Sequence, residues 1–264
     1  MNQLPYPLEF MHKFNLHKWL GLPIDDDDLK SIARIYGVSR ARLARIERAF
    51  RRNVDQLAAS LPIRERKPLE PPLTILALGD SITSDREGWV RILGRCWAGD
   101  SSRRLLDCAV SGNTSSDLLD RFYSTVLNQE FDWVVLFIGT NDCRQLDDPA
   151  RITQISAEEY RRNLEYLTDR LLERGKKLVL VTLPPVDNER LRAFFPQSNE
   201  CYESARLEEA NRFLRELAAR KGSKLADLAA AIQAQSLDVL EQDGLHLNGT
   251  GQTLLCRLLL DLLP

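Results

Sequence analysis

The stretch LTILALGDSIT, residues Leu73–Thr83, decides the fold of this chain. Its first half is a run of mainly apolar residues, and Gly79, Asp80 and Ser81 follow directly. A continuous apolar run, as opposed to an alternating one, is typical of a strand buried on both faces of a parallel sheet. Because Gly79 permits a tight turn, we expect Ser81 where this strand ends and a helix begins.

The rest of the chain repeats the pattern of an apolar run followed by an amphipathic helix. The segments Tyr160–Leu172, Leu207–Ala219 and Thr250–Leu262 have apolar residues on one helical face. Strands that alternate with helices predict a doubly wound α/β fold, a three-layer α/β/α sandwich around a parallel sheet. The further runs expected as strands are Arg104–Val110, Trp133–Ile138, Lys177–Leu183 and, the weakest, Lys224–Leu228.

Composition sets broad limits on function. With 264 residues the chain has room for one sizeable domain and a small appendage, and its net charge of -2 gives no global field toward nucleic acid or an acidic membrane. The five cysteines are scattered, without C-x-x-C or metal-ligand spacing, so we expect reduced thiols, no metal and no cofactor. We find no signal-peptide pattern and no apolar run of about 18 residues, and we therefore expect a cytoplasmic protein without a membrane span.

Four short motifs follow predicted strands or precede the last helix. In an α/β sheet with right-handed crossovers the strand ends lie along one edge, where sites are built, so we expect these motifs to converge. They are Gly79-Asp80-Ser81-Ile82-Thr83, Ser111-Gly112-Asn113-Thr114, Gly139-Thr140-Asn141-Asp142 and Asp243-Gly244-Leu245-His246.

Each motif also has an ordinary structural interpretation. Ser81 could simply cap a helix, and Gly112 could belong to a plain turn. Asn141 offers two N–H donors to an oxyanion, but it could equally cap the next element as an Asx-turn.

The fourth motif supplies the residue types of a proton relay. Serine chemistry needs a neutral imidazole to take the hydroxyl proton and a carboxylate to hold its tautomer. The chain has three histidines, and His12 and His17 lie in the N-terminal region, which leaves His246 for the α/β domain. Asp243 precedes His246 by three residues with Gly244 between them, a spacing that allows a local contact.

Together, and in this order, the four motifs resemble those of the SGNH (GDSL-like) hydrolase superfamily over about residues 73–264. The resemblance implies that Ser81 is the nucleophile, His246 the general base and Asp243 its orienting carboxylate. It also implies an oxyanion hole of the Ser81 N–H, the Gly112 N–H and the Asn141 side chain.

The resemblance further implies a flavodoxin-like sheet of five parallel strands in the order 2-1-3-4-5, and a role for Asp80 in supporting the turn. Many relatives have a glycine-rich turn after the first motif, whereas this chain continues with Ser84-Asp85-Arg86-Glu87. We therefore expect charge near the mouth of the site.

The function expected from these motifs is ester hydrolysis through an acyl-enzyme, on a short-chain or carbohydrate ester. One alternative is a lysophospholipase or thioesterase for longer acyl chains. Another is a regulatory protein that senses an ester and uses its N-terminal helices to bind DNA or a partner. The loops near Arg144–Ile152 and Pro184–Asn199 are expected to shape the pocket.

We predict two regions, an N-terminal helical appendage with its linker over residues 1–70 and the hydrolase domain over residues 71–264. The charged, proline-rich stretch Ile63–Pro72 is interpreted as the linker. Residues 29–60 resemble a helix-turn-helix with Gly37 in the turn, and residues 39–52 hold six arginines that could contact phosphates. The favoured interpretation is a helical hairpin that packs on the hydrolase domain or forms a homo-oligomer, with the arginines as a solvated face.

Overall fold

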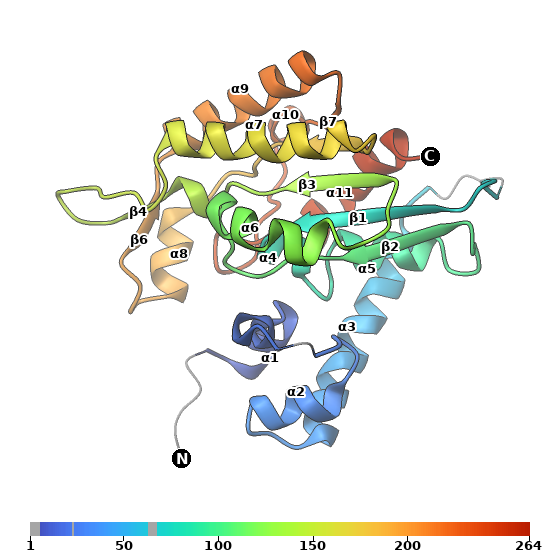
Figure 1. Cartoon of the computed structure of the whole chain (residues 1–264). Coiled ribbons are helices and arrows are strands. Elements are labelled where there is room, and N and C mark those ends of the chain that lie inside the picture. The colour runs from blue at the N-terminus through green and yellow to red at the C-terminus, as the bar shows by residue number, and fades with distance from the viewer. Residues whose placement is uncertain (1–5, 23, 63–67) are drawn as a thin grey trace.

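The centre of the molecule is a parallel sheet of five strands (Figure 1). The computed structural model describes residues 6–22, 24–62 and 68–264. The strands stand in the order β2-β1-β3-β5-β7, so the predicted 2-1-3-4-5 order is confirmed once β5 and β7 are counted as the fourth and fifth strands of this sheet. They are β1 (Leu73–Gly79), β2 (Arg103–Asp107), β3 (Trp133–Phe137), β5 (Lys177–Val181) and β7 (Lys224–Ala226).

The apolar runs form strands because both of their faces are covered. Ile75 to Leu78 of β1 have no exposed surface, and all five residues of β3 are buried. Ile75 pairs with Leu105 on one side and with Trp133 on the other, which places β1 in the middle of the sheet. The residues that follow β1 therefore lie at the centre of the edge where the strands end.

The helices cover the two faces as right-handed crossovers require. The chain moves from β1 to β2 in one direction and to β3 in the other, and this reversal puts α5 on one face and α6, α7 and α9 on the opposite face. In α7, Leu164, Leu167 and Leu171 have no exposed surface, as their helical spacing predicts. The helices of this domain are α4 (Ser81–Ser84), α5 (Trp89–Cys96), α6 (Ser115–Arg121), a π-helical turn (Phe122–Val126), α7 (Ala157–Glu173), α8 (Asn188–Phe194), α9 (Ser204–Lys221), α10 (Leu228–Gln235) and α11 (Gly249–Leu262).

A small antiparallel pair, β4 (Arg144–Leu146) and β6 (Glu200–Tyr202), joins the loops that follow β3 and β5. The sequence did not predict it, because three residues are too few to show a period of two. The pair fastens the two loops to each other beside the edge where the strands end (Figure 1).

The N-terminal region is helical and has a core of its own. It comprises α1 (Leu8–Lys13), the 3-10 helix η1 (Leu16–Leu20), α2 (Leu29–Ile35) and α3 (Arg40–Ala59). The first part of α3 packs in this core through Leu43 and Phe50, while Val54 and Ala58 belong to the core of the sheet domain. In Figure 1, α3 runs from α2 up to α5, so one helix connects the two cores.

This packing agrees with the interpretation of residues 29–60 as a hairpin on the hydrolase domain. All six arginines between residues 39 and 52 are exposed, and binding of nucleic acid through them stays a prediction. The division at residue 70 also stays a prediction, and residues 63–67 of the expected linker lie outside the described residues. In the described part of the chain no helix combines the length and the apolar character needed to cross a membrane.

Candidate active site

Ser81 is the first residue of α4 and follows β1 directly. A Cβ at Gly79 would lie 2.3 Å from the carbonyl oxygen of Phe137, so only glycine fits here. The Asp80 side chain caps α4 by accepting from the Ile82 N–H at 3.0 Å, the turn-supporting contact that was expected of it. Burial raises the pKa of Asp80 to about 7. This packing holds the Ser81 hydroxyl at the end of the central strand.

His246 and Asp243 meet Ser81 from the other end of the chain. The Nε2 of His246 lies 2.8 Å from the Ser81 Oγ, and its Nδ1 lies 2.6 Å from the Asp243 Oδ2. The other oxygen, Oδ1, accepts from the backbone N–H groups of Leu245 and His246 at 2.9 and 3.0 Å. Burial opposes ionisation of Asp243, but the adjacent imidazole and these hydrogen bonds outweigh it, so the pKa of Asp243 is lowered. The three residues thus form a connected hydrogen-bonded chain from carboxylate to hydroxyl.

The two remaining candidates lie on neighbouring strand ends. Gly112 follows β2 and has a φ of 78°, a conformation that favours glycine. Asn141 starts the 3-10 helix η3 (Asn141–Cys143) after β3, and its Nδ2 donates to the Asn113 carbonyl at 3.0 Å. An amide group has two N–H donors, and this bond uses one of them and fixes the orientation of the group.

Asp142 ties the second and third motifs together. Its carboxylate accepts from the Ser115 N–H at 3.0 Å and from the Ser115 hydroxyl. Asn163 of α7 in turn donates to the same hydroxyl at 3.0 Å. Burial raises the pKa of Asp142 to about 6. The loop that carries Asn141 is therefore anchored to the start of α6.

The N-terminal region lies over this site, which the sequence did not predict. The ring of Phe14 stacks on the imidazole of His246 with centroids 3.9 Å apart, and Phe10 contacts it edge-on at 5.9 Å. The Trp19 indole N–H donates to the Ser111 carbonyl at 2.5 Å. The only signal in the sequence was the high aromatic content of a segment too short to form a core by itself.

The charges after the first motif were expected near the mouth of the site, and the structure agrees only in part. Glu87 lines a groove that Phe14 and Asp243 also line, whereas Asp85 and Arg86 are buried under the N-terminal region, with 1% and 4% of their surface exposed. Lys13 lies 3.3 Å from Asp85, and Arg86 donates to the His12 carbonyl at 3.1 Å and to the Glu47 carboxylate at 3.1 Å. This turn binds the appendage because its charges are paired with groups of α1 and α3.

No group of three or more histidine, cysteine, aspartate or glutamate side chains gathers in the described ranges in the manner of a metal site. Cys143, beside Asn141, is buried, and burial raises the pKa of its thiol to about 12, so it is protonated at neutral pH.

Comparison with known proteins places this chain in a family. Residues 77–254 match the model of the GDSL-like lipase/acylhydrolase family. An acetylxylan esterase of Geobacillus stearothermophilus is 29% identical over 162 residues, which cover 58% of this chain and 69% of that protein. A solved structure of that esterase has a TM-score of 0.58 at 22% identity, covering 72% of this chain and 93% of that chain. Three of its solved forms are catalytic mutants in which a histidine, a serine or an aspartate is replaced by alanine.

Two further proteins are similar to this chain in fold or in sequence. The lipase/acylhydrolase of Enterococcus faecalis has a TM-score of 0.59 at 27% identity, covering 72% of this chain and 94% of that one. YqeF, an uncharacterized lipoprotein of Bacillus subtilis, is 28% identical over 122 residues, which are 42% of this chain and about half, 49%, of that protein. The family match begins at residue 77, so the N-terminal helices over the site lie outside it.

Proposed function

Because this chain belongs to the GDSL-like lipase/acylhydrolase family and is a carboxylic ester hydrolase, we propose that it removes short acyl groups, acetyl first among them, from a carbohydrate or another small hydroxyl compound. The observation that carries the proposal is the unbroken set of contacts from the Asp243 carboxylate through His246 to the Ser81 hydroxyl. The similarity to an acetylxylan esterase supports the substrate class. So does the burial of Ser81, of which 9% is exposed, because a small acyl group reaches such a hydroxyl more readily than a long one.

In the first half of the reaction Ser81 attacks the ester carbonyl while His246 Nε2 takes its proton. Asp243 holds the tautomer in which Nε2 is free to accept, and it stabilises the imidazolium that forms. The carbonyl oxygen, now an oxyanion, accepts hydrogen bonds from the Ser81 N–H, the Gly112 N–H and the Asn141 amide. The proton then passes from His246 to the leaving alcohol, and an acyl-enzyme remains on Ser81.

In the second half water takes the place of the alcohol. His246 removes a proton from the water as it attacks the acyl carbon, and the same donors hold the second oxyanion. The acid leaves and the Ser81 hydroxyl regains its proton. The same three residue types, a serine, an aspartate and a histidine, are the ones replaced in the catalytic mutants of the acetylxylan esterase.

The test is turnover of acetyl and butyryl esters by the purified chain and by Ser81→Ala, together with labelling by a fluorophosphonate. We expect the wild type to hydrolyse the acetyl ester faster than the butyryl ester and to be labelled once, on Ser81. The Ser81→Ala variant should lose both properties. The matched control is Ser124→Ala, since Ser124 is an exposed serine far along the chain. It should keep both, and labelling that survives in Ser81→Ala would contradict the assignment.

The same measurements address the alternatives. A lysophospholipase or thioesterase would prefer long acyl chains, so a rate that rises from acetyl to octanoyl esters would favour it. A regulatory protein would bind an ester without hydrolysing it, so no acid would be released. Labelling of Ser81 would then change how strongly the protein binds DNA or a partner.

Location and assembly are also proposals. A cytoplasmic location is supported by five cysteines that are all unpaired, and cell fractionation tests it. Nucleic-acid binding and a homo-oligomer through the N-terminal helices are supported only by the exposed arginines of α3. Salt-dependent binding to random duplex DNA and light scattering test these two.

A further inference from the structure

We infer that residues 8–20 form two walls of the substrate pocket, with Phe14 limiting the alcohol part of the ester and Trp19 limiting the acyl part. This inference rests on the proposed function. The segment lies outside the residues that match the family, so the selectivity it confers belongs to this chain.

The first wall is Phe14, which lies between His246 and a groove. Phe14 is 2% exposed and lies flat against the imidazole, with a centroid distance of 3.9 Å and an interplanar angle of 25°. On its other side is a groove of about 360 Å³, whose exposed lining surface is mainly apolar and includes Phe10, Phe50 and Phe194. The charged residues Glu9, Lys13, Glu87, Glu241 and Asp243 also line it. Removal of the Phe14 ring would therefore join this groove to the space around His246.

The second wall is Trp19, which covers Gly112. The position that a Cβ would take on Gly112 lies 3.5 Å from the indole Nε1 and 3.6 Å from the Cζ2 of Trp19. The indole N–H is held by the Ser111 carbonyl at 2.5 Å. More than half of Trp19, 55%, is exposed, so its ring extends from the oxyanion position to the surface of the molecule.

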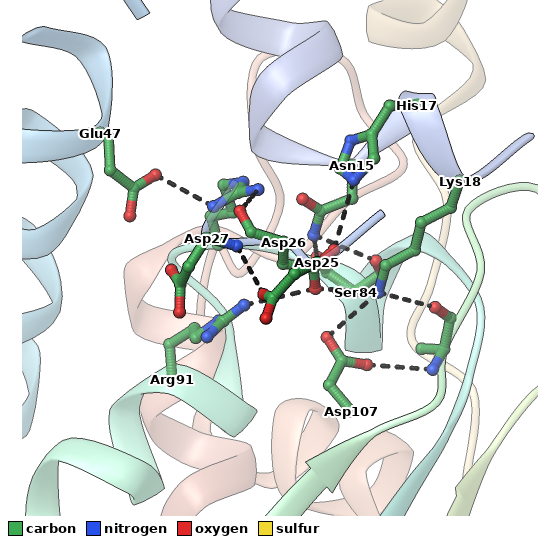
Figure 2. A network of polar contacts seen from close by, with 12 residues as sticks. Asn15, His17, Lys18, Asp25, Asp26, Asp27, Glu47, Ser84, Arg91 and Asp107 are labelled. Atoms are coloured by element: carbon green, nitrogen blue, oxygen red, sulfur yellow. Dashed lines mark hydrogen bonds and ion pairs between the residues drawn. The ribbon is translucent and has the colours of Figure 1, made fainter. Parts of the chain in front are cut away.

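The segment that carries both rings is fixed to the hydrolase domain by polar contacts of the residues between Phe14 and Trp19 and of the Phe14 carbonyl. The Asn15 amide donates to the Ser84 carbonyl at 2.6 Å, and the Ser111 hydroxyl donates to the Phe14 carbonyl. Figure 2 shows Asn15 beside Ser84 and Lys18 close to Asp26 and Asp107, where Lys18 Nζ lies 3.1 and 3.6 Å from the two carboxylates. Anchors at residues 15 and 18 hold the backbone between the two rings in place, so the rings can act as fixed walls.

The chemistry assigns one half of the substrate to each wall. His246 Nε2 gives its proton to the leaving oxygen, so the alcohol lies beside the imidazole and therefore beside Phe14. The carbonyl oxygen lies at the Gly112 N–H, so the carbon chain of the acyl group starts next to the ring that covers Gly112. Where a wall leaves no room for an extra methylene of the substrate, the transition state of the longer ester binds less tightly. Removal of the wall should restore this binding.

The experiment crosses two variants with two series of esters. Phe14→Ala and Trp19→Ala, made in the full chain, are compared with the wild type by kcat/KM. The alcohol series is ethyl, butyl and hexyl acetate, followed by acid release at constant pH. The acyl series is 4-nitrophenyl acetate, butyrate and octanoate.

We expect Phe14→Ala to raise the ratio of hexyl to ethyl acetate by about 10-fold or more, with the octanoate to acetate ratio changed less than about threefold. Trp19→Ala is expected to raise the octanoate to acetate ratio by about 10-fold or more and to change the hexyl to ethyl ratio less than about threefold. Each variant is therefore the control for the other. Phe194→Ala removes another ring of the same groove, one that contacts Phe10 and Phe195. In this variant the hexyl to ethyl ratio and the octanoate to acetate ratio should both stay near the wild-type values.

Unchanged ratios in both variants, or the same shift of both ratios in both variants, would overturn the inference, since the segment would then be a simple cover. A wild type that hydrolyses none of the esters would overturn the proposed function as well, which distinguishes the two failures. Should Phe14→Ala not fold, as judged by its melting curve, Phe14→Leu replaces it. It should shift the alcohol ratio in the same direction by about threefold, and an unchanged ratio in that variant overturns the assignment of Phe14.

Discussion

Each region of this molecule has a buried imidazole that lies against a carboxylate and a phenylalanine ring. A further imidazole of the appendage, that of His17, lies 3.3 Å from Asp26. In the hydrolase domain His246 Nδ1 lies 2.6 Å from Asp243, and in the appendage His12 Nε2 lies 3.1 Å from Glu47. Both imidazoles stack on a phenylalanine, His246 on Phe14 and His12 on Phe50. Both histidines are nearly or completely buried, at 4% and 0% exposure.

The pairs differ in what the second nitrogen reaches. His246 Nε2 meets the Ser81 hydroxyl at 2.8 Å, whereas His12 Nδ1 is buried with no hydrogen-bond partner among the residues that the structure describes. Glu47 is also held by Arg86, so its pair belongs to the ionic contacts between appendage and domain. A histidine paired with a carboxylate is therefore not by itself the mark of a catalytic site, and the contact with a hydroxyl at a strand end is what distinguishes the pair that we propose to be catalytic.

The largest effect that tests this contrast is expected from the two histidines. His246→Gln should lower kcat for an acetyl ester by about 10⁴-fold or more, because the base and the proton donor are lost together. His12→Gln should change kcat less than about threefold, since its ring only supports Glu47. Rates for both variants, with melting curves to show that both are folded, check this. A comparable loss in His12→Gln would mean that the appendage takes part in the chemistry.

The next effect concerns the carboxylate. Asp243→Asn is expected to lower kcat by about 10³- to 10⁴-fold, because an amide can donate to Nδ1 and then favours the wrong tautomer. The measurement is kcat over a range of pH with KM determined separately. A loss that appears in KM alone would assign Asp243 to substrate binding instead.

A smaller effect is expected at the oxyanion position. Asn141→Ala should lower kcat by about 10²- to 10³-fold with little change in KM, because the amide acts mainly on the charge of the transition state. Asn128→Ala, an exposed asparagine, is the control and should be neutral. If Asn141→Ala also lowers the free energy of unfolding by as much as it raises the activation free energy, the loss would come from the structural hydrogen bond with Asn113.

The smallest effect is one of stability, in the appendage pair. Burial raises the pKa of Glu47, but the contacts with His12, Arg86 and Arg51 outweigh this and lower it to about 2 from its usual 4.5. The resulting stabilisation is fully present above pH 4.5 and is lost as the pH falls from there toward 2. Glu47→Gln should therefore lower the Tm at pH 7 by about 2–4 °C, with kcat almost unchanged, and the difference in Tm from wild type should shrink at pH 3. A constant difference over this range would show that the charge of Glu47 is not its cause.

Much of the fold and of the site could be predicted because the responsible signals are local. The run Leu73–Leu78 is apolar except for Thr74, so we expected it to be covered on both faces, with Ser81 at the end of a buried strand. The spacing of Asp243 and His246 allowed their contact within one turn, and the structure has it at 2.6 Å. The strands β4 and β6 were missed because each has only three residues.

The sequence by itself determined where the buried strands run and which side chains stand at their ends, since apolar runs and turn residues act through neighbours along the chain. Only the tertiary structure decided what covers those side chains. Asn15 meets Ser84 across 69 residues and Phe14 meets Ser111 across 97, and no periodicity in the sequence records such pairs. They form because Phe14 belongs to the N-terminal core and also stacks on His246, so the polar groups next to it are buried and need hydrogen-bond partners in the sheet domain.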